Sequence, residues 1–183
     1  MAGKKFLEVE LPIIKQKVEL LASSEKDLIG RTVKIDLTRK LRGRSLEAIF
    51  KIKEEQGKLK IVLTRLHIFG YFIRRVVRKS TNYVEDSFSS EAGNAVLRIK
   101  PFMVTRKKVS RAVRKALREK AKELIEKEVK NKKYEDFFSE LLSGKLQRAL
   151  SLKLKKVYPL AFFDIRDVYV EKEEELVKKE KVK

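Results

Sequence analysis

Two neighbouring runs of the chain, residues 45–53 and 58–66, alternate apolar with polar side chains, and this alternation restricts the possible folds more than any other feature. The apolar positions lie two residues apart, at Leu46, Ala48, Phe50 and Ile52 and again at Leu59, Ile61 and Leu63. Because successive side chains of a strand point to opposite faces, a period of two indicates half-buried strands. The polar segment between the runs ends in glycine and is typical of a turn. The sequence therefore predicts an antiparallel β-hairpin.

The same period of two recurs in runs elsewhere in the chain. One run predicts a strand through Val33, Ile35 and Leu37. Further strands are expected over residues 82–88 and 95–105, which the turn-like segment SSEAGN separates. Residues 160–170 form a last β-like run, which must return to the sheet after several helices.

Other segments repeat their apolar residues every three to four positions, which is typical of amphipathic helices. A short helix is expected over residues 12–22, after an irregular arm over residues 1–11. Further helices are expected over residues 71–79, 108–131, 134–143 and 145–157. Gly144 and Pro159 follow the last two helices and are typical residues for ending a helix.

This order of elements predicts an α+β fold with a mostly antiparallel β-sheet or a partly closed, barrel-like core. A long basic helix and two or three shorter helices would pack on that core. We expect an N-terminal arm with a short helix over residues 1–27, a single α+β domain over residues 28–170, and a charged, frayed or disordered tail over residues 171–183. The 43% of hydrophobic residues are sufficient for one buried core.

The charge balance predicts a polyanionic partner. The chain has 46 Lys and Arg residues against 26 Asp and Glu residues, a formal net charge of +20. Folding does not require such an excess, and its self-repulsion opposes the compact state. Nucleic acid is the first candidate partner, and an anionic membrane surface is the second. The membrane ranks lower because no helix combines exposed bulky apolar residues with the bases, and no apolar run is long enough to span a bilayer.

Catalytic and metal-binding constellations are not recognisable in the sequence. Cysteine is absent and His67 is the only histidine, so no thiol nucleophile, histidine pair or Cys-ligated zinc site is possible. Asp164 and Asp167 lie three apart on an expected strand, where they would face opposite sides. No glycine-rich phosphate loop occurs. We therefore expect neither an enzyme nor a cofactor, although an unrecognised enzyme stays a third possibility. The absence of cysteine fits an intracellular protein.

The segment GYFIRRVVRKS, residues 70–80, concentrates positive charge without any acid. At about 100° per residue its apolar side chains lie on one side of a helix, and its bases lie on the other. Arginine predominates among these bases, and its planar guanidinium suits phosphate better than a point charge does. This helix therefore supplies the first group of candidate RNA-binding residues: Arg74, Arg75, Arg78 and Lys79.

A second basic group crowds the start of the long helix, and its acids appear only from Glu119 onward. The helix macrodipole favours the opposite order, so the arrangement acts against stability and indicates function. A third group surrounds Gly43. The further candidates for RNA binding from these two groups are Arg106, Lys107, Lys108, Arg111, Arg114, Lys115 and Arg118, together with Arg42 and Arg44. Several separate patches fit a protein wedged among nucleic-acid segments, and no helix-turn-helix, zinc finger, basic zipper or RNA-recognition motif is present.

Four motifs, in order, resemble one family across residues 28–170. They are LIGRTVKIDL, YFIRRVVRKSTNYVED, KPFMVTRKKVSRAVRKALRE and KVYPLAFFDIRDVYV. The sequence is similar to the archaeal and eukaryotic small-subunit ribosomal protein family called S-three-a, or eukaryotic-type S-one. It departs from that family at Lys34, Asp36, Arg39, Lys40 and Asp167. These differences and the short length are typical of a divergent, archaeal-like member.

The resemblance implies a structural, non-enzymatic component of the small ribosomal subunit in the cytoplasm. Family members sit on the platform, near the 3′ end of the small-subunit rRNA and the mRNA exit. The implied partners are small-subunit rRNA, neighbouring ribosomal proteins and mRNA near the exit, with no membrane. The basic groups would then neutralise rRNA phosphates, which positions a protein without base reading. The alternative is a free-standing nucleic-acid-binding or RNA-chaperone protein that is not stably bound to ribosomes.

Overall fold

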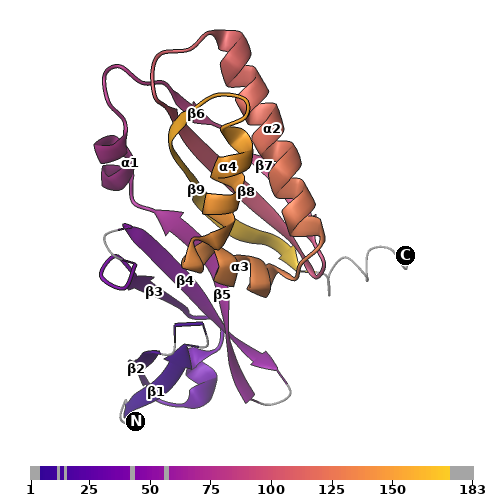
Figure 1. Cartoon of the computed structure of the whole chain (residues 1–183). Coiled ribbons are helices and arrows are strands. Elements are labelled where there is room, and N and C mark those ends of the chain that lie inside the picture. Colours follow the sequence, from indigo (N-terminus) through magenta and orange to yellow (C-terminus); the bar gives the residue numbers. More distant parts are fainter. Residues whose placement is uncertain (1–4, 12, 15, 42–43, 56–57, 174–183) are drawn as a thin grey trace.

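A seven-stranded sheet forms the centre of the protein in the computed structural model, which describes residues 5–11, 13–14, 16–41, 44–55 and 58–173 (Figure 1). Its strand order is β3-β4-β5-β9-β8-β6, with β7 also paired to β8, and all pairs are antiparallel. The predicted α+β fold with a mostly antiparallel sheet is confirmed, and the sheet is open rather than closed into a barrel. The strands are β3 Thr32–Asp36, β4 Leu46–Glu55, β5 Lys58–Ile68, β6 Tyr83–Glu85, β7 Phe88–Ala92, β8 Ala95–Thr105 and β9 Leu160–Glu173.

The predicted hairpin is confirmed as β4 paired with β5. Its inward positions are the alternating apolar residues, and Phe50 and Ile52 are completely buried. β9 returns to the sheet between β5 and β8 after three helices, as predicted. It runs through Glu173, so the first three residues of the predicted tail belong to a strand, and the rest of that tail lies outside the described residues.

Three helices cover one face of the sheet: α2 Arg111–Lys130, α3 Tyr134–Ser143 and α4 Lys145–Leu154 (Figure 1). α2 packs against β7 and α4, while α4 packs against β9. The buried residues of α2 recur every four positions, as its amphipathic pattern predicts: Leu117, Ala121, Ile125 and Val129. Gly144 joins α3 to α4 with φ +73°, a left-handed conformation that glycine adopts without strain. Within the described residues, no helix is both long and apolar enough to cross a membrane.

The short basic helix is α1 Gly70–Val76, which ends earlier than predicted. Val77 adopts extended φ/ψ angles of −79° and 125°, so Arg78 and Lys79 lie in the following turn rather than on the helix. The apolar side of α1 faces the sheet, where the ring of Phe72 packs edge-on against Phe162 at 5.7 Å between centroids. The prediction of a helix with an inward apolar face holds, while its extent to residue 79 was wrong.

The N-terminal prediction of an irregular arm and a short helix was wrong. β1 Lys5–Leu11 and β2 Gln16–Ala22 form an antiparallel hairpin, followed by the short 3₁₀ helix η1 Glu25–Leu28. The physical reason is that cross-strand burial favours a period of two, with Leu7 opposite Leu20 and Val9 opposite Val18. A helix over this segment would separate these pairs and leave the apolar residues of β1 without a partner.

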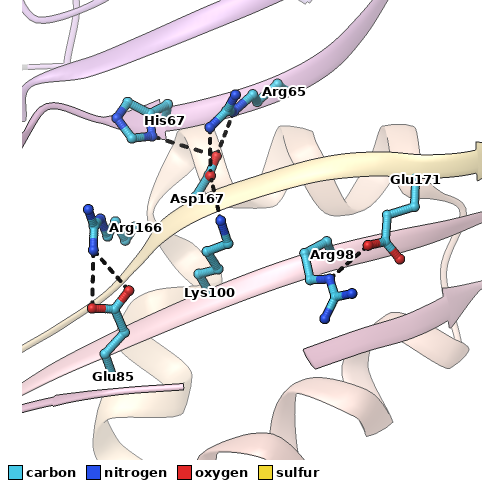
Figure 2. Close-up of polar contacts among 8 residues, drawn as sticks. All are labelled: Arg65, His67, Glu85, Arg98, Lys100, Arg166, Asp167 and Glu171. Atoms are coloured by element: carbon cyan, nitrogen blue, oxygen red, sulfur yellow. Dashed lines mark hydrogen bonds and ion pairs between the residues drawn. The ribbon is translucent and has the colours of Figure 1, made fainter. Parts of the chain in front are cut away.

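The two halves of the sheet meet at a short junction where β5 pairs with β9 over only three residue pairs. Asp167 of β9 is 2% exposed and lies between the two halves (Figure 2). It accepts two hydrogen bonds from Arg65 of β5, at 2.8 and 2.7 Å, and one from Lys100 of β8, at 3.4 Å. The hydrogen bond to Asp167 raises the pKa of Arg65 further above its ordinary value. The Asp167 carboxylate therefore links β9 to β5 and to β8 through charged hydrogen bonds, in addition to the backbone pairing of these strands.

Candidate nucleic-acid interface

A tight turn presents the bases that follow α1. Thr81 closes it, since its hydroxyl donates to the carbonyl oxygen of Arg78 at 2.8 Å and its backbone N–H donates to the same oxygen at 3.1 Å. Arg78, Lys79 and Ser80 are exposed around this turn. Because both ends of the turn are bonded to one another, the basic side chains project from a defined backbone.

A second basic loop, residues 106–108, is bonded to the end of that turn through Asn82. The Thr105 backbone N–H donates to the Asn82 carbonyl oxygen at 3.0 Å, and the Asn82 backbone N–H donates to Thr105 Oγ1 at 2.9 Å. The Asn82 Oδ1 atom then accepts from the Val109 backbone N–H at 2.7 Å. Asn82 thus holds both ends of the basic loop, whereas sequence reasoning gave this residue no role.

These two loops meet in a shallow hollow of about 710 Å³, lined by Lys79, Ser80, Arg106, Lys107 and Lys108. The structure therefore brings together bases from two of the predicted groups that lie far apart in the sequence. The concentration of four cations around one open hollow creates a positive potential without a nearby acid among the lining residues.

A third connection reaches the same end of the molecule, between α4 and β9 (Figure 1). The Arg106 backbone N–H donates to the Pro159 carbonyl oxygen at 3.4 Å, and the exposed Lys155 and Lys156 precede Pro159. Sequence reasoning missed these two lysines. A signal existed, because no acid occurs between Glu140 and Asp164. We call the four hollow cations, Lys155 and Lys156 together the basic end: Lys79, Arg106, Lys107, Lys108, Lys155 and Lys156.

The bases in the two halves of α2 differ in their pairing. Ser110 caps the helix, and the bases of the N-terminal half project from one flank: Arg111, Arg114, Lys115 and Arg118. Among the described residues only Lys115 of these has an acidic partner, Glu119 at 3.7 Å, and that pair is exposed. In the C-terminal half, by contrast, Glu123 pairs with Lys120 and Lys127 at 2.8 and 2.7 Å.

The pairing in the C-terminal half of α2 also changes the pKa values of its carboxyl groups. Hydrogen bonds from Lys120 and Lys127 lower the pKa of Glu123 to about 2. Burial opposes ionisation of Glu128, but Lys153 and Lys132 outweigh it and hold the pKa of Glu128 below its ordinary value. The positive charge that remains available to a partner therefore lies on the N-terminal half, adjoining the basic end.

The remaining predicted RNA-binding residues differ in their surroundings. Arg74 and Arg75 are exposed on α1 and make no ion pair with the described part of the chain. Arg42 lies outside the described residues. Arg44 is engaged inside the protein: its Nε donates to Asp164 Oδ2 at 2.8 Å, and its Nη1 donates to the Leu141 carbonyl oxygen at 2.9 Å. Asp164 is 2% exposed, so this pair joins the loop before β4 to β9.

Arg44→Gln is expected to lower the free energy of unfolding by about 3 kcal/mol, because it leaves the buried Asp164 carboxylate without its charged partner. Urea denaturation followed by circular dichroism measures this loss. The matched control is Arg39→Gln, an exposed arginine of the neighbouring loop, for which we expect less than about 0.5 kcal/mol. A folded Arg44→Gln protein whose stability is unchanged but whose RNA affinity falls would contradict the structural role.

The acidic and histidine side chains do not form a catalytic arrangement among the described residues. A register shift in the β8–β9 ladder between Lys100 and Pro101 interrupts the side-to-side alternation of side chains that was expected between Asp164 and Asp167. Each of these two carboxylates accepts hydrogen bonds from a different arginine, Arg44 for Asp164 and Arg65 for Asp167. His67 Nδ1 lies 3.6 Å from Asp167 Oδ1, within the junction of Figure 2. No group of three metal-ligating side chains is found in the part of the chain that the structure describes.

Comparison with known proteins yields one consistent family. The model of the Ribosomal S3Ae family matches residues 1–174. The small ribosomal subunit protein eS1 of Nanoarchaeum equitans is 27% identical over 179 residues, which cover 93% of this chain and 90% of that protein. The protein of the same name from Pyrobaculum aerophilum is 29% identical and is covered over 78% of its length. The one from Saccharolobus islandicus is 26% identical and is covered over 84%.

Proposed function

Because the chain belongs to the ribosomal S3Ae family, we propose that its basic end and the adjoining basic helices bind small-subunit rRNA. The family consists of structural ribosomal proteins, so the chain has a structural role in the small subunit and is not an enzyme. Its partners are accordingly rRNA and other ribosomal proteins. The residues that we assign to phosphate contact are Arg74, Arg75, Arg78, Lys79, Arg106, Lys107, Lys108, Arg111, Arg114, Lys115, Arg118, Lys155 and Lys156.

One observation carries this assignment: the cations of three separate connections gather at one end without acidic partners among the described residues. On the sheet, by contrast, several bases are paired with acids, as Arg98 is with Glu171 and Arg166 is with Glu85 (Figure 2). Unpaired cations release counterions from RNA when they contact its phosphates, which is the main source of affinity for nucleic acid. A surface already neutralised by its own carboxylates gains little from such contact.

We infer the finer location from the resemblance of the four sequence motifs. The protein would lie on the platform of the small subunit, near the 3′ end of the rRNA and the mRNA exit, in the cytoplasm. Contact with mRNA at the exit is a further part of this proposal. Phosphate contacts dominate this mode of binding, which agrees with the absence of a base-reading motif.

Sedimentation tests the ribosomal assignment directly. The native protein is expected to travel with the small subunit through a sucrose gradient, and to stay there after a high-salt wash. A protein that runs free at low salt would instead favour the second candidate, a free-standing nucleic-acid-binding or RNA-chaperone protein. If the protein travels with the small subunit, cross-linking of those gradient fractions will show whether rRNA lies against the basic end.

Asn82→Ala is expected to weaken rRNA binding about fivefold, which corresponds to the loss of roughly one hydrogen bond of ~1 kcal/mol. The substitution releases Val109 and loosens the loop that carries Arg106, Lys107 and Lys108, but it removes no cation. The slope of log affinity against log salt should therefore stay unchanged. Filter binding over a series of salt concentrations measures both quantities.

Asn94→Ala is the matched control, because its side chain also accepts from a backbone N–H, that of Tyr134 at 3.1 Å, away from the basic end. This variant should lose a similar amount of stability and keep its RNA affinity. Equal weakening in both variants would mean that Asn82 acts only through global stability. A reduced salt slope in Asn82→Ala would also contradict a positioning role.

A further inference from the structure

An apolar groove of about 560 Å³ lies between β1, β5 and the start of α3, near the end of the molecule opposite the basic loops (Figure 1). Its apolar lining includes Ile13, Ile61, Leu63 and Phe138. Ile13 and Ile61 are partly exposed in the groove, whereas Leu63 and Phe138 belong to the buried core beneath it. The groove is therefore an accessible depression that opens onto the hydrophobic core.

Strand edges form two walls of this groove. Consecutive residues 8–10 of β1 and 59–63 of β5 line it. β1 pairs with β2 alone, and residues 61–63 of β5 pair with β4 alone, because β9 joins β5 only at residues 65–67. In the described structure, each of these stretches thus has one side on which no strand is paired. Such edges are templates for an added extended segment.

The rim of the groove is acidic although the chain carries a net charge of +20. Glu8, Glu10 and Glu135 stand around it and are exposed, and Lys60 is the one lysine among the lining residues. Glu8 pairs with the exposed Lys17 at 3.2 Å, whereas Glu10 and Glu135 make no ion pair with other described side chains. Three carboxylates at this place repel RNA, so the groove is unsuited to the partner of the basic end. They attract a basic segment that also has apolar side chains to bury.

We propose that this groove binds an extended segment of another protein in which apolar and basic residues alternate. The segment would pair with the unpaired edge of β5 at residues 61–63. Since side chains of a strand alternate in direction, one set would enter the apolar groove and the other would reach the acidic rim. This protein-binding site is separate from the proposed RNA-binding surface and consists of different residues.

A peptide-binding experiment on the full chain tests the proposal. The probe is a short fluorescein-labelled peptide of alternating valine and lysine, and fluorescence anisotropy measures its dissociation constant. We expect saturable binding that the double variant Glu10→Lys with Glu135→Lys weakens by at least about tenfold, through like-charge repulsion. Ile61→Lys, which places a charge in the apolar lining, should weaken it similarly, with folding checked by circular dichroism.

Two controls distinguish this site from general electrostatic attraction. Glu91→Lys with Glu119→Lys makes the same change of charge at exposed acids that do not line the groove, and it should alter peptide affinity less than twofold. A peptide of alternating valine and glutamate should not bind. Equal weakening by both double variants, or equal binding of both peptides, would overturn the proposal.

A third comparison identifies a competing occupant. If the probe binds only after residues 174–183 are removed, the groove belongs to the C-terminal segment of this chain and the proposal of a separate partner fails. Neutralising the basic end should leave peptide affinity unchanged. Substitutions in the groove therefore test peptide binding, and substitutions at the basic end test rRNA binding, so the two proposals can fail independently.

Discussion

Simultaneous replacement of Lys79, Arg106, Lys107 and Lys108 by glutamine is expected to weaken small-subunit rRNA binding by about 100-fold or more near 0.1 M salt. These four cations surround one hollow and have no acidic partner among the described residues, so each is available to a phosphate. At roughly 0.7–0.9 per contact, the slope of log affinity against log salt should fall by about 3. Filter binding to rRNA fragments over a salt series measures both values.

The matched control replaces four exposed lysines away from the basic end by glutamine: Lys5, Lys26, Lys34 and Lys51. The total charge change is the same, so any effect of net charge alone should be equal in the two variants. We expect the control to lose much less affinity and to retain most of the salt slope. Equal losses in both variants would show that binding depends on net charge rather than on the basic end.

Asp167→Ala should have the largest effect on stability, with a loss of about 3–5 kcal/mol in the free energy of unfolding. The substitution leaves Arg65 and Lys100 without their shared carboxylate at the place where β5 meets β9. Few backbone bonds join the two halves of the sheet there, so little remains to hold the junction together. Urea denaturation monitored by circular dichroism and by fluorescence of the tyrosines measures the loss.

Glu171→Ala is the control for Asp167→Ala. It removes a carboxylate of the same strand that pairs with Arg98 at 2.7 Å near the surface, and it should cost at most about 1 kcal/mol. If Asp167→Ala costs no more than this control, the junction is held by packing alone. A loss in Asp167→Ala seen by only one spectroscopic probe would indicate that the two halves of the sheet unfold separately.

Segments whose pattern is strong over many residues were predicted well. The strand over residues 95–105 and the helix over residues 134–143 coincide with β8 and α3 in their bounds. In both elements, most of the residues that the local hydrophobic period predicts to be buried are buried in the tertiary structure. The hairpin of β4 and β5 was equally clear, because each strand repeats the alternation of the other.

The N-terminal segment shows where such patterns fail. Residues 12–22 contain enough apolar residues to satisfy either period, and Pro12 at their start favoured a helix. The deciding factor is a cross-strand partner, since Leu20 and Val18 pack against Leu7 and Val9, which lie opposite them, and are partly buried. Local propensity carries no information about a partner strand whose own pattern is weak.

For the candidate RNA-binding residues too, the sequence supplies one part of the answer and the tertiary structure supplies the other. Composition and the acid-free runs predict a polyanion-binding protein and select α1 and the start of α2 as candidates, which stay predictions. They were insufficient to separate Arg44, which the buried Asp164 holds from 120 positions away, from bases that stay unpaired. They also missed Lys155 and Lys156, which join the basic end only because Pro159 contacts the loop at Arg106.

The sequence by itself thus determined the class of fold, most of its strands and helices, and the sign of the charge that a partner must carry. These properties depend on residues that are close together in the chain and on the total numbers of acidic and basic residues. Only the tertiary structure decided which cations are paired, which loops meet, and where an acidic groove lies beside unpaired strand edges. Those properties depend on distances between residues far apart in the chain, and electrostatic pairing and hydrogen bonding act over a few ångströms of space rather than along the sequence.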